Sequence, residues 1–261
     1  LAILHTKKKE FGIAFLDVST GNFLVSEGDL PYIQKLIHSF NPSEVLFQRS
    51  NHKFFLEHFG NDHHTYHLDD WCFTKDFAEE KLLKHFGTNS LKGFGIESLE
   101  LAIIAAGAAI QYVTDTQNND LKHITKVSRI NEGKYVWLDK FTIRNLELYN
   151  SANENASTLI DVIDHTSSPM GGRLLKRWVA LPLKDKTQIE KRLNTVEFLR
   201  DENTLSEQFL NQLTQIGDIE RLITKAAVGK ISPREINQLK NGLSAVLPIK
   251  EACALSKSKE L

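Results

Sequence analysis

The first half of the chain alternates short apolar segments with amphipathic helical segments. The stretch FGIAFLDVS, residues 11–19, is apolar on both faces, which is typical of a central strand covered on both sides. The turn residues STGN follow and predict a hairpin to a second strand, FLVSE. Apolar residues then recur at helical spacing over residues 30–40, and EVLFQ at 44–48 predicts another buried strand. Strands that alternate with helices in this way indicate an α/β domain.

The second half of the chain has helical periodicity. An alanine-rich helix over residues 98–113 closes the first half, and its small side chains predict a close approach to the sheet. The polar stretch at 115–123 lacks apolar periodicity, so the domain boundary is predicted at residue 120. Helices are predicted from residue 158 onward, and the last begins at Ser232 with the S-P-x-E start of a capping box. Residues 121–261 therefore predict an all-α second domain.

Charge is distributed unevenly between the two halves. Residues 1–120 carry 10 basic and 16 acidic residues, whereas residues 121–261 carry 22 basic and 17 acidic residues. The second half is mildly basic, but the whole chain of 261 residues has a net charge of −1, unlike a self-sufficient nucleic-acid-binding domain. The two cysteines predict no disulfide framework and fit a cytoplasmic protein. No apolar run approaches the ~20 residues of a membrane span.

The segment SSPMGGRLLKRW, residues 167–178, combines two glycines with three basic residues at the start of a helix. A helix N-terminus favours anions, so a phosphate site is one interpretation. No strand precedes the glycines, however, and Ser168 followed by Pro169 is a good N-terminal cap. Two glycines in a first turn indicate a close backbone neighbour. The favoured interpretation is packing, and contact with DNA or a partner segment is the alternative.

Three other segments contain residue types used in catalysis or metal binding, in incomplete motifs. NDHHTYHLDD, residues 61–70, lacks the helical H-E-x-x-H spacing, which favours a solvated strand edge over a metal site. Asp17 could be a magnesium ligand of a ribonuclease-H-like nuclease, but EVLFQRS ends in Gln48 and Arg49 where a second carboxylate would be sought. TKAAVGKIS, residues 224–232, lacks the first glycine and the hydroxyl of a P-loop. No catalytic, metal-binding or cofactor-binding residue is predicted in this chain.

A series of segments, taken in order, resembles the bacterial DNA mismatch repair family MutS. The resemblance covers nearly the whole chain, and the combination is specific although no single piece is. The segments are EFGIAFLDVSTGNF, FNPSEVLF, LKGFGIE, AAGAAIQYVTDTQ, LDKFTIRNLEL, DHTSSPMGGRLLKRWVALPL and IGDIERLITKAAVGKISPREINQLK.

The resemblance implies a fold and a place within a longer protein. Residues 1–120 would be the connector domain, a ribonuclease-H-like α/β fold without nuclease chemistry. Residues 121–261 would be the first part of the helical core, or lever, domain. The mismatch-reading domain of the family would precede Leu1, and the DNA clamp, the returning lever helices and the ATPase domain would follow Leu261. The chain itself is therefore expected not to be an enzyme.

The resemblance also implies partners. The parent protein would be a cytoplasmic homodimer that uses ATP and Mg²⁺, binds mismatched duplex DNA and recruits MutL. This chain would link the mismatch-binding, clamp and ATPase domains mechanically and offer a MutL-binding surface. The alternative is a magnesium-dependent, ribonuclease-H-like nuclease with a helical accessory domain. The candidate interdomain or packing residues are Arg144, Asn145, Glu147, Pro169, Gly171, Gly172, Arg173 and Trp178.

Overall fold

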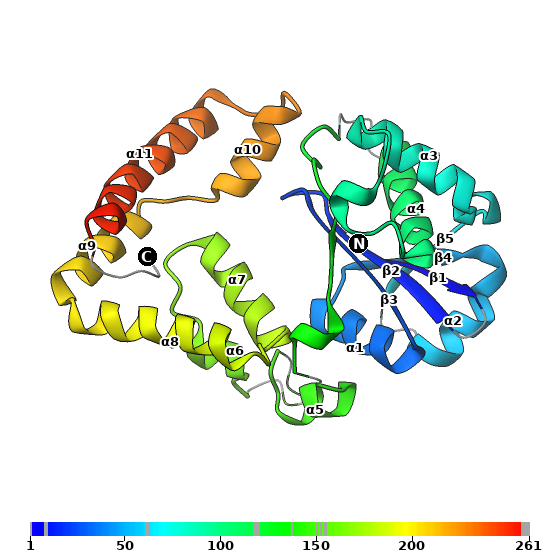
Figure 1. Ribbon diagram of the computed structural model, residues 1–261, viewed down its shortest axis with the longest axis horizontal. Coiled ribbons are helices and arrows are strands. Elements are labelled where there is room, and N and C mark those ends of the chain that lie inside the picture. The colour runs from blue at the N-terminus through cyan, green and yellow to red at the C-terminus, as the bar shows by residue number, and fades with distance from the viewer. Residues whose placement is uncertain are drawn as a thin grey trace. The chain divides into compact units, whose positions relative to one another are not determined.

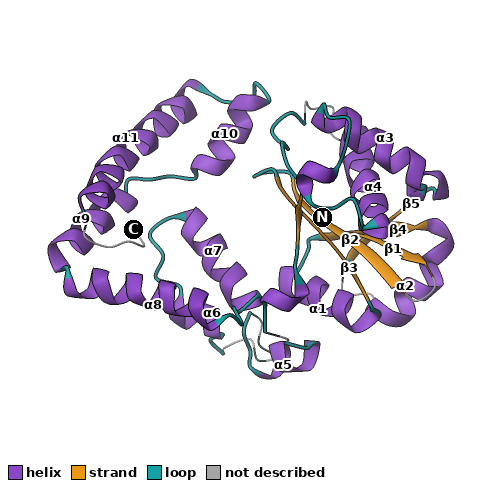
Figure 2. Cartoon of the chain, viewed as in Figure 1, coloured by secondary structure: helices purple, strands orange, loops and turns teal. Residues whose placement is uncertain are grey.

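The chain divides into two compact units in a computed structural model (Figure 1). The first comprises Leu1–Asn131 with Leu138–Lys140 and is called the α/β unit; the second comprises Glu132–Trp137 and Phe141–Leu261 and is called the helical unit. The structure describes residues 2–7, 10–60, 63–116, 121–136, 138–149, 151, 153 and 156–256. Both the α/β half and the helical half that the hydrophobic pattern predicts are present (Figure 2).

The α/β unit is built on one mixed sheet with the strand order β5-β4-β1-β2-β3-β6. The first three strands are antiparallel neighbours, β4 runs parallel to β1, β5 runs parallel to β4, and β6 runs parallel to β3. Figure 1 shows α3 and α4 on one face of this sheet and α1 and α2 on the other. The elements are β1 (Ala2–Lys7), β2 (Glu10–Asp17), β3 (Asn22–Gly28), α1 (Leu30–Phe40), β4 (Glu44–Gln48), α2 (His52–Phe59), β5 (His64–Leu68), α3 (Lys75–Phe86), α4 (Glu100–Thr116) and β6 (Ser128–Arg129). Short 3₁₀ helices span Arg49–Asn51, Asp70–Phe73, Lys92–Phe94 and, in the helical unit, Glu132–Lys134.

The α4 helix approaches the sheet closely because its contacting residues are small. A Cβ atom added to Gly12 on β2 would lie 2.1 Å from the carbonyl carbon of Leu101, so only glycine fits there. A Cβ atom added to Gly107 would lie 2.5 Å from the Cα atom of Ala78 on α3. The Glu27 carboxylate accepts a hydrogen bond of 2.9 Å from the backbone N–H of Ala102 and thus caps the free start of α4 from β3. These contacts confirm the close approach of α4 to the sheet that the alanine-rich pattern predicts.

The α/β unit continues beyond the predicted boundary. Residue 120 itself lies outside the described residues, but the next eleven residues belong to this unit. Their apolar side chains are buried, each no more than 7% exposed; they are Leu121, Ile124, Val127 and Ile130. The β6 strand in this segment pairs with β3, and the Ser26 hydroxyl donates to the carbonyl of Ile130. The unit extends to Asn131 because these side chains complete its core.

The helical unit is formed by short and medium helices with little buried surface. Its helices are α5 (Lys140–Asn145), α6 (Leu159–Ile163), α7 (Pro169–Ala180), α8 (Lys186–Asp201), α9 (Asn203–Leu213), α10 (Ile219–Ala227) and α11 (Pro233–Leu255). The predicted capping box of α11 is present: the Ser232 hydroxyl accepts from the Glu235 N–H, and the Glu235 carboxylate accepts from the Ser232 N–H. These bonds satisfy the free backbone groups at the start of the longest helix described.

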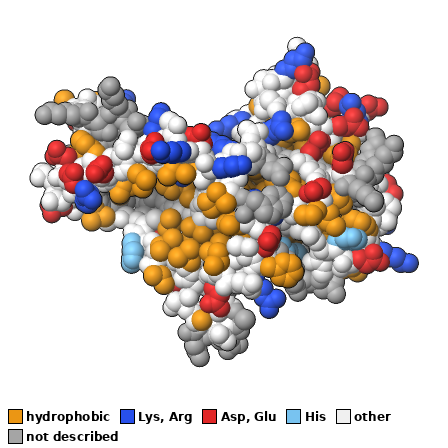
Figure 3. Space-filling view, turned by 60° about the horizontal axis from the view of Figure 1, so that its bottom comes forward, with side chains coloured by type: hydrophobic (Ala, Val, Ile, Leu, Met, Phe, Trp, Pro, Cys, Tyr) orange, Lys and Arg blue, Asp and Glu red, His pale blue; other side chains and the backbone are white. Residues whose placement is uncertain are grey.

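Large apolar side chains are exposed over much of the helical unit. Figure 3 shows hydrophobic side chains gathered in patches on one face of the molecule, including the side that the helical unit occupies. Among the described residues of the α/β unit, the large exposed apolar side chains are Tyr66 and Trp71. The helical unit has many more, among them Leu159, Val162, Ile163, Leu174, Leu193, Val196, Leu210, Ile223, Ile236, Leu243 and Leu247. Within the part of the chain that the structure describes, no helix is both long and apolar enough to cross a membrane.

Candidate functional site

The start of α7 is the capped helix that the segment at 167–178 predicts. The Ser168 hydroxyl accepts a hydrogen bond of 3.1 Å from the Gly171 N–H, and Pro169 occupies the first helical position. The atoms nearest to a Cβ added at either glycine come from the chain's own preceding turn: Thr166 and Ser168 at Gly171, and Thr166 and Asp164 at Gly172, at 3.3–3.6 Å. These are all side-chain atoms, so the predicted close backbone neighbour is not found, and no atom of another helix is among the nearest.

Arg173 forms an ion-pair network with the start of α10. Its Nη1 lies 2.7 Å from Oδ2 of Asp218, and its Nη2 lies 2.8 Å from Oδ1 of the same carboxylate and 2.6 Å from Oε2 of Glu220. The Arg173 and Asp218 side chains are only 29% and 18% exposed. The hydrogen bonds from Arg173 hold the pKa of Asp218 below its ordinary value, and Asp218 in turn raises the pKa of Arg173. The two-pronged geometry is the strong form of a charge-assisted contact.

The sequence did not reveal this network. Arg173 was a candidate interdomain or packing residue, but no pattern at 218–220 distinguishes its partners from other acidic residues at a helix start. The partners follow Arg173 by 45 and 47 residues. Ion pairs between residues this far apart follow no fixed spacing in the sequence, so no periodic pattern predicts them. The available signal was the cap itself: Asp218 precedes a strongly amphipathic helix and accepts from the Arg221 N–H.

The end of α7 contacts α8 and the segment before α6. The Arg192 guanidinium lies 3.7 Å from the centre of the Trp178 ring, a cation–π contact, and the indole remains 41% exposed. The Tyr149 hydroxyl donates to the carbonyl of Lys176 at 2.9 Å, and burial raises the pKa of this tyrosine. The last turns of α7 thus contact α8 through one side chain and the segment before α6 through another.

The remaining predicted site residues lie around the end of α5. Arg144 and Asn145 are exposed, whereas Glu147 adopts a left-handed conformation with φ of 47°. The Glu147 carboxylate accepts from the Ser151 hydroxyl at 2.7 Å, and its carbonyl accepts from the Leu159 N–H at the start of α6. Arg144, Asn145 and Glu147 therefore form one group, which is hydrogen-bonded to the start of α6. The candidates from Pro169 to Trp178 form a second group on α7.

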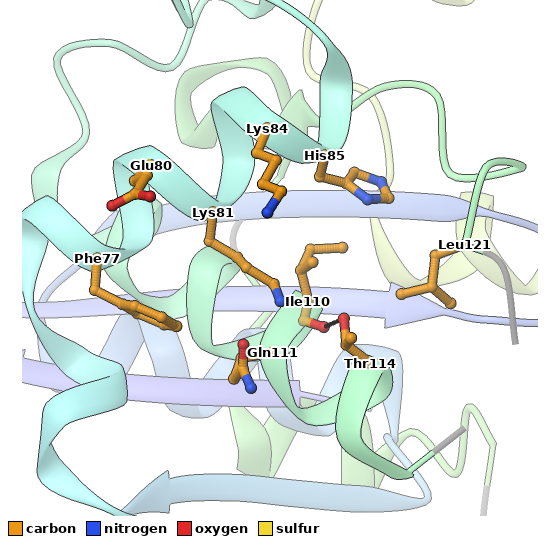
Figure 4. A pocket seen from close by; sticks show the side chains of 9 residues that line it. All are labelled: Phe77, Glu80, Lys81, Lys84, His85, Ile110, Gln111, Thr114 and Leu121. Atoms are coloured by element: carbon orange, nitrogen blue, oxygen red, sulfur yellow. Dashed lines mark hydrogen bonds between the residues drawn. The ribbon is translucent and has the colours of Figure 1, made fainter. Parts of the chain in front are cut away.

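A groove of about 440 Å³ lies between α3 and α4 in the α/β unit (Figure 4). Phe77, Ile110 and Leu121 supply apolar side chains, and Lys81 and Lys84 extend from α3 toward α4. The other lining residues are Glu80, His85, Gln111 and Thr114. An apolar floor beside two ammonium groups suits an apolar side chain flanked by acidic groups.

The acidic residues considered as metal ligands have structural contacts instead. The Asp17 carboxylate accepts from the Ser19 N–H at 2.9 Å and from the Ser19 hydroxyl at 2.7 Å, so it stabilises the β2–β3 turn. Asp69 pairs with Arg49 at 3.1 Å. Over the described ranges, no group of three or more His, Cys, Asp or Glu side chains is arranged to hold a metal ion.

Comparison with known proteins assigns both units to one family. The family described as MutS domain II matches residues 1–125, and MutS domain III matches residues 141–261. The chain is 55% identical over 251 residues to the DNA mismatch repair protein MutS of Christiangramia forsetii, 54% identical over 251 residues to that of Flavobacterium psychrophilum and 53% identical over 253 residues to that of Bacteroides thetaiotaomicron. These matches cover 96–97% of the chain and 29% of each relative, so the chain spans less than a third of their length. Since both of its halves match MutS domains in tandem, the chain belongs to the MutS family of DNA mismatch repair proteins.

Proposed function

We propose that this chain is the mechanical link of a longer MutS protein that binds mismatched duplex DNA under the control of ATP. The α/β unit would be its connector domain and the helical unit the first part of its lever domain. The parent would be a cytoplasmic homodimer that uses ATP and Mg²⁺, and this chain would have no enzymatic activity of its own. No residue described here is assigned to the nucleotide, to Mg²⁺ or to a base.

The tandem match to MutS domains II and III carries this proposal. The strand order supports the ribonuclease-H-like description, because three antiparallel strands are followed by two that run parallel to the first. The exposed apolar side chains of α8–α11 support an incomplete lever, since surfaces of this kind are normally buried by further chain or a partner.

The connection can be tested in the complete protein through two exposed apolar residues of α8. Leu193 and Val196 are 59% and 63% exposed here, so most of their apolar surface is left for contacts with further chain, which replacing both by Asp would disrupt. We expect L193D/V196D to bind a mismatched duplex normally without nucleotide but to lose ATP-triggered release. Lys191→Asp, at an exposed position of the same helix, is the matched control. Normal release by the double variant, measured by fluorescence anisotropy of labelled DNA, would contradict a lever role for this helix.

The α3–α4 groove is the best candidate for the MutL-binding surface. The α/β half is acidic overall, yet this groove presents Lys81 and Lys84 beside an apolar floor. Such a surface would take an apolar side chain of MutL that is flanked by acidic residues. We expect K81E/K84E to weaken MutL binding in a pull-down with the complete protein, whereas Lys53→Glu on α2 should leave it unchanged. Equal capture by both variants would place the MutL surface elsewhere.

The nuclease alternative gains no support from a specific contact, because Asp17 is engaged by Ser19. A cleavage assay with Mg²⁺ on duplex and junction DNA separates the two functions. Cleavage that disappears in Asp17→Asn would favour the nuclease.

A further inference from the structure

The starts of α7 and α10 are joined by side chains. Arg173 lies one turn into α7 and reaches both Asp218, the N-cap residue of α10, and Glu220 in its first turn. The atoms nearest to the glycines at the start of α7 come from the preceding turn and not from α10. Figure 1 shows α10 near the start of α7, with α8, α9 and α11 leading around the outside of the helical unit. The guanidinium group of Arg173 thus supplies an ion-paired junction between the two helix starts.

The covalent route between these two helix starts buries few side chains, and those that it buries, such as Leu181, Leu183 and Ile216, lie outside α8 and α9. It runs through α8 and α9, and neither helix contains a buried residue. A segment with few buried apolar contacts opens locally at low free-energy cost. The path along the chain therefore constrains the distance between α7 and α10 only weakly.

Asp218 has two roles that a substitution can separate. Its Oδ1 accepts from the Arg221 N–H as the cap of α10, and both carboxylate oxygens accept from Arg173. Arg221 Nε also lies 3.5 Å from Oδ2. Asparagine caps helices about as well as aspartate, but it carries no charge for Arg173. Asp218→Asn should therefore weaken the junction and leave the start of α10 intact.

We propose that Arg173, Asp218 and Glu220 form a latch that holds the start of α10 at the start of α7. When the latch opens, α8–α11 change position relative to α7 while every helix remains folded. The inference rests on the proposed function for its use, since this movement would be one that a lever transmits. Packed elements with two discrete arrangements are the usual basis of such movements.

The test is a distance measurement between spin labels in the 261-residue chain. Labels are attached to Lys176→Cys on α7 and Ala227→Cys on α10, both exposed positions, in a Cys253→Ser background. Cys72 is buried and its thiol pKa is raised to about 11, so it reacts slowly and can stay. We expect one narrow distance distribution, and in Arg173→Gln and in Asp218→Asn an added population longer by about one helical turn, ~5 Å.

The controls separate the latch from folding. Arg177→Gln, an exposed position of the same helix, should leave the distribution unchanged. The double variant R173Q/D218N should resemble R173Q, because Arg173 takes part in every contact of the latch and its loss leaves Asp218 without that partner. An unshifted distribution in both single variants would overturn the proposal, and so would loss of the helical circular dichroism signal in Asp218→Asn. Neither result bears on ATP-triggered DNA release, which tests the proposed function separately.

Discussion

Gly12→Ala tests the claim that the α/β core is limited by backbone contact. The added Cβ would lie 2.1 Å from the carbonyl carbon of Leu101, 2.2 Å from its oxygen and 2.6 Å from the Ala102 nitrogen. All three are backbone atoms at the start of α4, so no side chain can rotate away. The helix must shift, and its Ala102, Ala105 and Ala106 side chains are fully buried against neighbours.

The cost can be estimated from two contributions. Adding a methyl group to a packed site typically costs ~1–3 kcal/mol. Displacing α4 also strains the hydrogen bond from the Ala102 N–H to the Glu27 carboxylate, and an unsatisfied buried partner costs ~1–3 kcal/mol. We therefore expect a loss of about 3 kcal/mol in the free energy of unfolding of the α/β unit. For a unit of this size that loss lowers Tm by roughly 10 °C.

The assay is differential scanning calorimetry of the 261-residue chain, which separates the transitions of two units that unfold independently. Gly93→Ala is the matched control, because nothing lies within 4 Å of its added Cβ and its backbone is not left-handed. A Tm for Gly12→Ala within about 1 °C of the wild-type value would refute the close approach of β2 to α4.

Three further predictions concern the cap of α4, the cap of α7 and the end of the α/β unit. Burial raises the pKa of Glu27, so its ionisation opposes folding as pH rises. Glu27→Gln should therefore gain stability relative to wild type between about pH 4 and about pH 7 in urea unfolding. A difference in unfolding free energy that does not change with pH would contradict the raised pKa. Ser168→Ala should cost about 1 kcal/mol in the helical unit, measured by chemical denaturation against Ser157→Ala, and an equal effect of both would contradict the cap. A chain that ends at Asn131 should unfold cooperatively, whereas one that ends at residue 120 should not. The reason is that burying the four apolar side chains of 121–130 contributes up to ~6–12 kcal/mol, which is comparable with the ~5–15 kcal/mol stability of a domain. Cooperative unfolding of the shorter chain, followed by circular dichroism, would show that the core closes without them.

The sheet and its helices could be predicted because burial there follows a periodic pattern. Residues 11–16 are buried without interruption on β2, as the continuous apolar run indicates, and the alanines of α4 pack where small residues were expected. Residues 121–130 were assigned to the second domain because the polar stretch at 115–123 placed the predicted boundary at residue 120. Their own apolar positions recur every third residue, which matches neither a strand nor an α-helix. The segment is largely irregular apart from the short β6, and its burial depends on a core formed by distant strands.

The candidate site could be predicted only where the contact is local. The Ser168 cap and the capping box at Ser232 connect residues three apart, so a short motif encodes them. The network of Arg173 joins residues 45 positions apart, and its existence depends on how α8 and α9 return the chain. The glycines at the start of α7 predicted a close backbone neighbour, but the atoms nearest to an added Cβ are side-chain atoms of Asp164, Thr166 and Ser168 in the preceding turn.

The two units differ in what fixes their geometry, and the difference follows from their composition. In the α/β unit, glycine and alanine bring backbones together, and a displacement of α4 meets resistance from the whole sheet. In the helical unit, α8 and α9 bury no residue, the few buried apolar side chains, such as Leu181 and Leu222, are scattered, and polar contacts of Arg173 join the starts of α7 and α10. Polar contacts are strongly directional and break over short distances, whereas an apolar core resists all displacements in proportion to the area it buries. A unit with a continuous buried core therefore moves as a whole, whereas one held by a few polar contacts between helix starts rearranges when one of these contacts is lost. If the helical unit acts as the proposed lever, this property would place its sensitivity at Arg173.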